Sequence, residues 1–397
     1  MMHLPALLIA SLATAQALPS QLFSNLVPQK VLATYNSLPK TNSIPSSFPQ
    51  YTDMSAGNWL LFSPDTWTTG FFPTTLYALN ERKNLCGATS ANGLNAANWL
   101  TLGRAASTAE IPLETKNNQG HDVGFLSFPF VEELAVNPGN QTALTAVRLF
   151  AADLAARFNS LVGCTRSWDT ADPTDFTVII DNMMNLEVLF LATELFGNQT
   201  LRNIAIAHAD TTMMNHIRSD GSTWHVVEYN STTGAVIKKR TAQGFSDSST
   251  WSRGQAWGVY GFANMYKRTG NTAYLTTARK LAKYFLNHVP STGIVPWDFN
   301  APTPAPADSS ASNIMTVGLL LLADVDTSPA MAAQWKSAAI NLLNKMTALA
   351  WNPSWKSLLS NGTVNKPANN YLTGTVYGDY YFIKAGNILK QQGLATC

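Results

Sequence analysis

Six mostly apolar stretches with helical spacing recur along the chain, and each opens on a polar or aromatic signature. The starts of consecutive stretches lie between 55 and 72 residues apart. These starts are marked by Trp67, Asp122, Asp181, Arg253, Ser312 and Gly378. Such a repeat is typical of an architecture that uses one supersecondary unit several times. It constrains the fold more than any other feature of the sequence.

Amphipathic segments lie between the apolar stretches, with charged and polar residues on one face. They cover residues 141–159, 199–217, 272–288 and 329–349. An apolar stretch followed by an amphipathic one predicts a helical hairpin whose first helix is buried and whose second helix faces solvent. Six such hairpins bury their apolar helices best by closing into a ring. The sequence therefore predicts an all-α fold, an (α/α)6 toroid of six inner and six outer helices.

The N-terminal segment MMHLPALLIASLATAQA is typical of a signal peptide. Its apolar run is too short to span a membrane, and the small residues Ala15 and Ala17 suit cleavage before Leu18. We therefore expect residues 1–17 to be removed and the protein to be secreted, extracellular, glycosylated and of fungal type. Length alone suggests two or three domains of ~100–200 residues, but the repeat predicts a single domain over 18–397. Four N-x-S/T sequons fit this expectation, at Asn140, Asn198, Asn230 and Asn361.

Composition limits the partners that the protein can have. A formal net charge of +2 gives no field that would attract nucleic acid. No later segment is long and apolar enough to cross a membrane. Charged residues make up 13% of the chain, against roughly 25% in an average soluble domain, so a large buried core is expected. The three cysteines, Cys86, Cys164 and Cys397, allow at most one disulfide within the chain, and the sequence leaves its pairing open.

Two aspartates stand at the beginning of apolar helical stretches. Asp181 lies in FTVIIDNMMNLEVLF and Asp122 lies in HDVGFLSFPF. A carboxylate among apolar side chains is unfavourable unless it is solvated, paired or used in chemistry. Two of them therefore indicate acid/base chemistry. The alternative interpretation is that both are helix N-caps.

The predicted toroid brings these residues together. All inner helices run the same way, so their N-terminal ends share one mouth, and neighbouring axes lie ~8–10 Å apart. Six helix N-termini favour an anionic ligand, such as a sugar that carries a carboxylate. Arg253 would suit that carboxylate as a bidentate clamp. Flat faces for a sugar ring would come from Trp67, Trp168, Trp251 and Trp257, although burial in the core is the simpler expectation for any single tryptophan.

The motifs at these positions resemble those of the unsaturated glucuronyl hydrolases, glycoside hydrolase family 88. The similarity is carried by HDVGF around Asp122, DNMMN around Asp181 and WSRGQAWGVYGF from Trp251, and it extends in order from WTTGFFP to GDYYF. It implies an (α/α)6 barrel that removes a 4,5-unsaturated glucuronic acid from the non-reducing end of oligosaccharides left by polysaccharide lyases. The resemblance further implies that the glycosidic bond is not attacked directly. Instead, a proton would add at C4 and water at C5 of the enol ether.

The resemblance also implies roles for individual residues. Asp181 would be the catalytic acid/base, and Asp122 would hold substrate hydroxyls and influence the protonation of Asp181. His121 would lie close to the ligand, and Trp67 and Trp168 would stack on sugar rings. The remaining substrate-binding positions would be His225, Gln243, Trp251, Arg253 and Trp257. Of these, His225 has the weakest local signature, since a lone histidine is more often structural.

Neither a metal nor a cofactor is expected. The chain has no DxDxDG calcium loop and no His, Cys or carboxylate cluster with metal spacing, so chelators should leave activity intact. Burial beside Val178 and Ile180, together with the nearby Asp122, should raise the pKa of Asp181, whereas a helix N-terminus and Arg253 should lower it. We expect the first effects to prevail and the pH optimum to be acidic.

Three other functions remain open from the sequence. The related unsaturated rhamnogalacturonyl hydrolases share the toroid and differ in the sugar behind the unsaturated unit. An inverting glycosidase would use Asp122 and Asp181 as acid and base on saturated glycosides. A sugar-binding toroid without catalysis would use them only as hydrogen-bonding groups. The loops at 301–312 and 361–374 should border the mouth, but the sequence gives neither the aglycone preference nor the oligomeric state.

Overall fold

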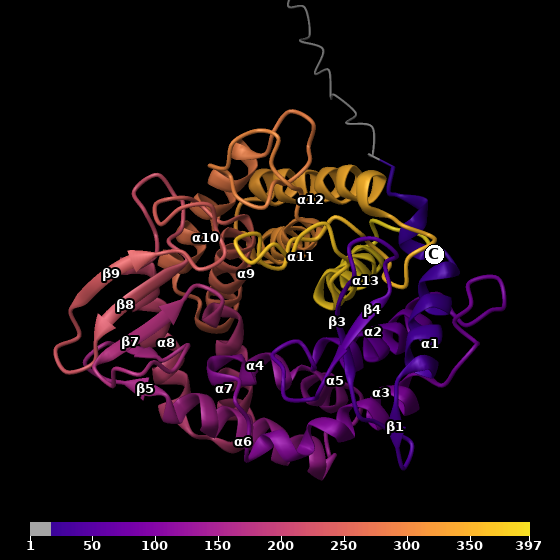
Figure 1. Ribbon diagram of the computed structural model, residues 1–397, viewed down its shortest axis with the longest axis horizontal. Coiled ribbons are helices and arrows are strands. Elements are labelled where there is room, and N and C mark those ends of the chain that lie inside the picture. Colours follow the sequence, from indigo (N-terminus) through magenta and orange to yellow (C-terminus); the bar gives the residue numbers. More distant parts are fainter. Residues whose placement is uncertain (1–16) are drawn as a thin grey trace, which may run out of the picture.

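The computed structural model describes residues 17–397, and the predicted signal peptide lies outside the described residues except for its last residue, Ala17. Two concentric rings of helices make up most of the described chain (Figure 1). The inner ring contains α2 (Phe71–Cys86), α4 (Val123–Leu126) with α5 (Phe128–Val136), α7 (Asn182–Phe196), α9 (Ser252–Thr269), α11 (Ser309–Val325) and α13 (Val376–Gln391). The outer ring contains α1 (Leu26–Ser37), α3 (Trp99–Ser107), α6 (Gln141–Ala156), α8 (Gln199–Asn215), α10 (Thr272–His288) and α12 (Pro329–Ala350). The predicted (α/α)6 toroid is confirmed.

The burial of each helix follows its sequence pattern. In α11, 14 of the 17 residues are buried, because the helix has neighbours on every side. In α12 only seven of 22 residues are buried, and they recur at spacings of three and four, as on the inward face of an amphipathic helix. One hydrophobic cluster of buried residues extends from Leu22 to Ala395. The predicted domain boundaries stay a prediction.

The second inner helix is interrupted between α4 and α5. Ser127 separates the two segments, and Pro129 stands in the first turn of α5. Proline has no N–H and disfavours a helical residue before it, so the chain bends at this point. The short α4 nevertheless packs against α7, the next inner helix. This contact places the residues around Asp122 beside those around Asp181.

The ring closes where α13 packs against α2, the last and first inner helices (Figure 1). Arg82 on α2 donates to the Asn387 side chain on α13 at 2.9 Å, and Asn387 donates to the Ala78 carbonyl at 2.8 Å. A disulfide joins Cys86, the last residue of α2, to Cys397. The outer ring is completed by α1, from the N-terminal part of the chain, which packs against α2. The hairpin order predicted from the sequence did not foresee this closure.

Short antiparallel strands lie between the helices along the chain. They are β1 (Lys40–Thr41), β2 (Ile44–Pro45), β3 (Phe48–Thr52), β4 (Trp59–Phe62), β5 (Phe158–Asn159), β6 (Cys164–Thr165), β7 (Asp175–Ile179), β8 (Val226–Asn230) and β9 (Val236–Arg240). The largest sheet has the order β7-β8-β9, and its β7 and β8 are rich in β-branched and aromatic residues. Ile179 pairs with Val226, and the Ile180 N–H donates to the His225 carbonyl at 3.0 Å. This sheet therefore brings His225 to the start of α7.

Candidate active site

The two aspartates occupy the N-cap positions of their helices without capping them. Neither Asp122 at α4 nor Asp181 at α7 accepts a hydrogen bond from its helix N–H groups. Asp308, by contrast, caps α11 by accepting from the N–H groups of Ser310 and Ala311. The alternative interpretation of both aspartates as simple N-caps is therefore wrong. Their carboxyl groups are available for another task.

A close approach of two helices brings the aspartates together. A side chain at Gly124, two residues after Asp122, would place its Cβ 2.5 Å from the Cα of Asn185 on α7. Only glycine therefore lets α4 lie this close to α7. In the motif HDVGF, the glycine is therefore needed for the close packing of α4 against α7, and the aspartate is a candidate for the chemistry.

Asp181 is buried, with 9% of its surface exposed, and its Oδ2 has no hydrogen-bond partner. Burial raises the pKa of Asp181 to about 6, although the positive charge of Arg253 and a hydrogen bond from the Trp257 side chain act in the opposite direction. Burial therefore has a larger effect on the pKa of Asp181 than the opposing charge of Arg253. The carboxyl group can hold a proton under mildly acidic conditions, as a general acid must.

Asp122 is also held in its protonated form. Burial is the main cause that raises its pKa well above the usual value, and the charge of Asp181 adds to it. Arg157 and the Asn185 side chain oppose this shift. From the sequence we expected Asp122 to raise the pKa of Asp181, whereas in the structure the charge of Asp181 raises the pKa of Asp122. Asp122 therefore favours its protonated form, and ionisation of Asp181 strengthens that preference.

His121 lies against Asp122 in the interior. Its Nε2 is 3.4 Å from Asp122 Oδ1, while its Nδ1 faces Ser167 Oγ and Asn185 Nδ2, both at 3.4 Å. Burial lowers the pKa of His121 to about 3, so the imidazole is neutral. The neutral imidazole therefore does not hold Asp122 as an anion, and its Nε2 makes no hydrogen bond to the described residues.

His225 faces Asp181 from the sheet. Its Nδ1 accepts a hydrogen bond from the Ala242 N–H at 3.2 Å, which requires the ring proton to be on Nε2 when the imidazole is neutral. That Nε2 lies 3.9 Å from Asp181 Oδ2. Burial lowers the pKa of His225 well below its usual value, so the ring is neutral. The histidine with the weakest sequence signature is thus placed beside the candidate acid.

The four tryptophans divide into two pairs. Trp251 and Trp257 are fully buried, and they form walls around Asp181 and His225; the Trp251 ring lies 4.3 Å from the His225 ring. Trp67 and Trp168 are only partly buried, so part of their surface is open to a ligand. Trp168 meets His225 edge to face, with ring centroids 6.3 Å apart. The predicted stacking role suits this second pair.

Arg253 and Gln243 organise the loop that follows Asn361. The buried Arg253 guanidinium pairs with Asp308 at 3.2 Å, and it donates to the carbonyls of Thr363 and Val364. Gln243 Nε2 also donates to the Val364 carbonyl, at 3.1 Å. Protein acceptors thus already engage both terminal nitrogens of Arg253, and its contact with a substrate carboxylate stays a prediction. Its charge nevertheless reaches Asp181.

Some residues of the site were missed by the sequence analysis. Asn185 lies one helical turn after Asp181 and reaches both His121 and Asp122. Arg157, at the end of α6, lowers the pKa of His121 and Asp122 through its charge. A buried polar residue at the i+4 position of an apolar helix was an available signal for Asn185. No local pattern marked Arg157, because its proximity depends on the packing of α6.

Within residues 17–397, no group of three His, Cys, Asp or Glu side chains could hold a metal ion. No helix of this part of the chain is long and apolar enough to cross a membrane. The expected absence of a cofactor stays a prediction.

A ring of inner helices with two protonatable carboxyl groups among tryptophans at one mouth defines a class of protein, the (α/α)6-toroid glycoside hydrolases. A scan against protein-family models finds no match. The chain is 38% identical over 327 residues to an unsaturated glucuronyl hydrolase of Formosa agariphila, covering 80% of this chain and 78% of that protein. It is 31% identical over 353 residues to one of Bacillus sp. strain GL1, covering 85% and 89%. This protein belongs to the unsaturated glucuronyl hydrolase family.

Solved structures agree with this assignment. A crystal structure of an unsaturated glucuronyl hydrolase specific for heparin superposes with a TM-score of 0.83 at 29% identity, covering 94% of this chain and 97% of that chain. The enzyme from Bacillus sp. GL1, described as responsible for the degradation of glycosaminoglycan, superposes with a TM-score of 0.81 at 27% identity, covering 94% and 96%. The toroid is thus shared along nearly the whole length of both.

Proposed function

We propose that this protein releases 4,5-unsaturated glucuronic acid from the non-reducing end of lyase-generated oligosaccharides. The observation that carries the proposal is the buried carboxyl group of Asp181, whose pKa is raised to about 6 and which has a second aspartate with a raised pKa, Asp122, nearby. Relatives named for the same reaction support it. One solved relative, with a TM-score of 0.81 at 27% identity, holds the oligosaccharide dGlcA-Glc-Rha-Glc.

The mechanism begins with Asp181 in its protonated form. Asp181 gives its proton to C4 of the enol ether, and the positive charge that develops at C5 is met by water. The Asp181 carboxylate takes a proton from that water, so the group returns to its starting state. The hemiketal formed at C5 then opens and releases the remaining sugar. Asp122, which favours its protonated form, would hold substrate hydroxyls, and the His225 Nε2–H faces Asp181 while it is an anion.

The substrate would lie between the open faces of Trp67 and Trp168. Their partial exposure at the mouth supports a stacking role, whereas the buried Trp251 and Trp257 shape the wall behind the reacting carbons. The loop around Thr363 and Val364, held by Arg253 and Gln243, would border the adjoining sugar. This loop would therefore determine which sugar is preferred behind the unsaturated unit.

A decisive experiment follows the ultraviolet absorbance of the unsaturated unit. Purified protein is mixed with lyase-generated disaccharides that end in unsaturated glucuronate, beside its Asp181→Asn variant and the control Asp324→Asn, a change of an exposed carboxylate at the end of α11. We expect absorbance to fall with the wild type and the control, and the Asp181 variant to be slower by about 10²–10⁴-fold. An equal fall in the Asp181→Asn variant would remove Asp181 from the chemistry.

The choice of substrates separates the other functions. Disaccharides with rhamnose behind the unsaturated unit test for a rhamnogalacturonyl hydrolase, and saturated glycosides test for an inverting glycosidase. We expect unsaturated glucuronides to be turned over fastest. Binding of all these sugars without turnover would support the sugar-binding toroid instead.

We infer that the protein is secreted and acts outside the cell. The support is the signal-like N-terminal segment and the four sequons. The fungal-type origin stays a prediction, and the relatives named above come from bacteria. Expression of the full chain in a secreting eukaryotic host should give a product in the medium that begins at Leu18. Retention of residues 1–17 in a protein that stays inside the cells would contradict the inference.

A further inference from the structure

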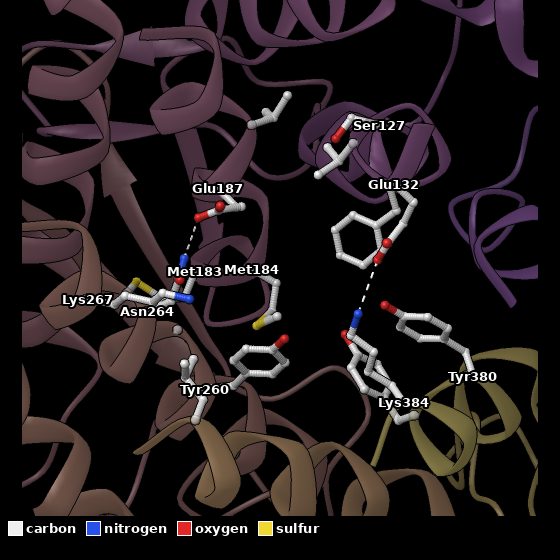
Figure 2. A pocket seen from close by; sticks show the side chains of 16 residues that line it. Ser127, Glu132, Met183, Met184, Glu187, Tyr260, Asn264, Lys267, Tyr380 and Lys384 are labelled. Carbon is white, nitrogen blue, oxygen red and sulfur yellow. Dashed lines mark hydrogen bonds and ion pairs between the residues drawn. The ribbon is translucent and has the colours of Figure 1, made fainter. Parts of the chain in front are cut away.

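A cavity of about 220 Å³ lies inside the ring (Figure 2). It is lined by residues of α5, α7, α9, α11 and α13. Asn264 on its wall is twelve residues beyond Ser252, which places it ~18 Å further along α9 from the mouth at 1.5 Å per residue. None of the ten residues assigned to the candidate active site lines this cavity. The cavity is therefore a separate feature of the fold.

Aromatic side chains separate the cavity from the aspartates. Phe125 packs against Trp257 with ring centroids 5.6 Å apart, and Trp257 packs against Tyr381 at the same distance. Phe125 also meets Phe128, which lines the cavity, at 5.4 Å. Trp257, whose side chain hydrogen-bonds to Asp181, therefore stands between Asp181 and Tyr381, a residue of the cavity wall.

Three tyrosine hydroxyls in the cavity have no partner among the described residues. Tyr260, Tyr380 and Tyr381 line it, and none of their hydroxyls makes a hydrogen bond within residues 17–397. Figure 2 shows the hydroxyls of Tyr260 and Tyr380 pointing into the same space. Tyr380 and Tyr381 are only 5% and 1% exposed. These hydroxyls are not among the fully buried polar atoms that lack a partner, so they are open to the cavity and can bond to a ligand there.

Three of the four charged side chains that line the cavity are already paired, and the fourth, Lys267, is exposed to solvent. Lys384 lies 3.3 Å from Glu132 and 3.6 Å from Glu81. On the opposite wall, Glu187 pairs with Arg268 and accepts a hydrogen bond from Asn264 at 2.6 Å. Paired charges offer no net field for an ion, but their oxygens can still accept from hydroxyl groups. The cavity therefore suits an uncharged ligand with several hydroxyls.

Apolar side chains complete the lining. Met183, Met184, Val188 and Leu321 stand between the polar groups. A sugar ring presents hydroxyls at its edge and C–H groups on its faces, and aromatic and aliphatic walls suit those faces. We propose that this cavity is a second binding site, for a neutral monosaccharide or a comparable polyol, separate from the site of the aspartates. The proposal does not depend on the reaction that the aspartates catalyse.

The test is ligand-observed NMR with saturation transfer, using d-glucose and N-acetyl-d-glucosamine as probes. Tyr260→Phe and Tyr380→Phe each remove one hydroxyl and keep the shape of the wall. Each change should weaken binding about two- to tenfold, the usual effect of losing one hydrogen bond. In the double variant, the affinity should fall by the product of these two factors. Tyr266→Phe, on the same helix as Tyr260 but outside the cavity, is the matched control and should change nothing.

Two further measurements separate a loss of binding from a loss of folding, and binding in the cavity from binding at the mouth. The unfolding temperature of each Phe variant should match the wild type, because the removed hydroxyl has no protein partner. Trp168→Ala, at the mouth, should leave binding in the cavity intact. The proposal is overturned if neither probe binds at tens of millimolar, which would mean that water alone fills the cavity. It is equally overturned if binding survives in the double variant and disappears in Trp168→Ala, which would place the sugars beside the aspartates.

Discussion

Burial gives Asp181 a pKa of about 6, and this value sets the pH at which the group can donate a proton. Activity should be highest below about pH 6, where the carboxyl group is protonated. Above it, kcat/KM should fall up to tenfold per pH unit, because the protonated fraction falls by that factor. The pH profile of the absorbance assay measures this, with Asp324→Asn as a control that should give the wild-type profile. A flat profile from acid to alkaline pH would contradict the role of Asp181.

The same carboxyl group should make stability depend on pH. The pKa of Asp181 is raised from 3.8 in the unfolded chain to about 6 in the folded one. Between these values the folded state binds more protons than the unfolded state, so the free energy of unfolding decreases as pH rises. For this residue alone the decrease is at most about 3 kcal/mol.

The Asp181→Asn variant tests this linkage. Asparagine cannot ionise, so the variant should gain stability relative to the wild type as pH rises from 4 to 7. Urea unfolding at both pH values gives the difference, which cancels the titration of other groups. The Asp324→Asn control should show no such gain. An Asp181→Asn variant that is no more stable at pH 7 than at pH 4, relative to wild type, would mean that Asp181 is not protonated by burial.

At the scale of the elements, Arg253 connects the start of α9 to the start of α11 and to the loop after Asn361. Its guanidinium pairs with Asp308, the residue that caps α11, and it also donates to the carbonyls of Thr363 and Val364. The same group lowers the pKa of Asp181 by its charge. Arg253 therefore has a geometric role and an electrostatic role, and two substitutions can separate them.

Arg253→Lys keeps the charge and loses the planar fork of donors, whereas Arg253→Gln loses the charge as well. Both variants should raise KM, because the loop carbonyls lose donors. Only Arg253→Gln should shift the falling limb of the pH profile to higher pH, since the pKa of Asp181 is then no longer lowered. It should also be less stable by about 3–5 kcal/mol, because Asp308 is left buried without its partner. Equal shifts of the pH limb in both variants would argue against the electrostatic role.

At the scale of the whole molecule, the disulfide between Cys86 and Cys397 ties the first inner helix to the end of the chain across a separation of 311 residues. A cross-link over so long a loop restricts the unfolded chain and stabilises the fold by on the order of 5 kcal/mol in the chain-entropy description. A reductant should therefore lower the unfolding temperature of the wild type. It should not lower that of a Cys86→Ser variant, which is the matched control. Equal sensitivity of both proteins to the reductant would contradict this role.

The rings could be predicted from the sequence because the inner helices are buried along their whole length and are therefore apolar along their whole length. The apolar stretches of α7, α9 and α11 could be buried only inside, and the signatures at their starts had to meet. Asp122 and Asp181 were found for that reason. The Gly124 contact that brings them together depends on the distance between two helices, which periodicity does not give.

Features that depend on pairing between distant segments could not be predicted. The register of β7 with β8 brings His225 to Asp181. The use of α1 as an outer helix and the choice of Cys397 as the partner of Cys86 depend on how the ring closes. The hydrogen bonds of Arg253 depend on a loop more than a hundred residues later in the chain. None of these contacts leaves a local signal in the sequence.

The most direct test of the central claim is the position at which a solvent proton enters the substrate. The reaction is run in D2O with an unsaturated glucuronyl disaccharide and followed by NMR. We predict that one deuterium is delivered to one face of C4 in the initial product, and that Asp181→Asn forms almost none of it. Product formed in H2O and then transferred to D2O controls for later exchange. Release of the sugar with the C4–C5 double bond intact and no deuterium at C4 would contradict the account.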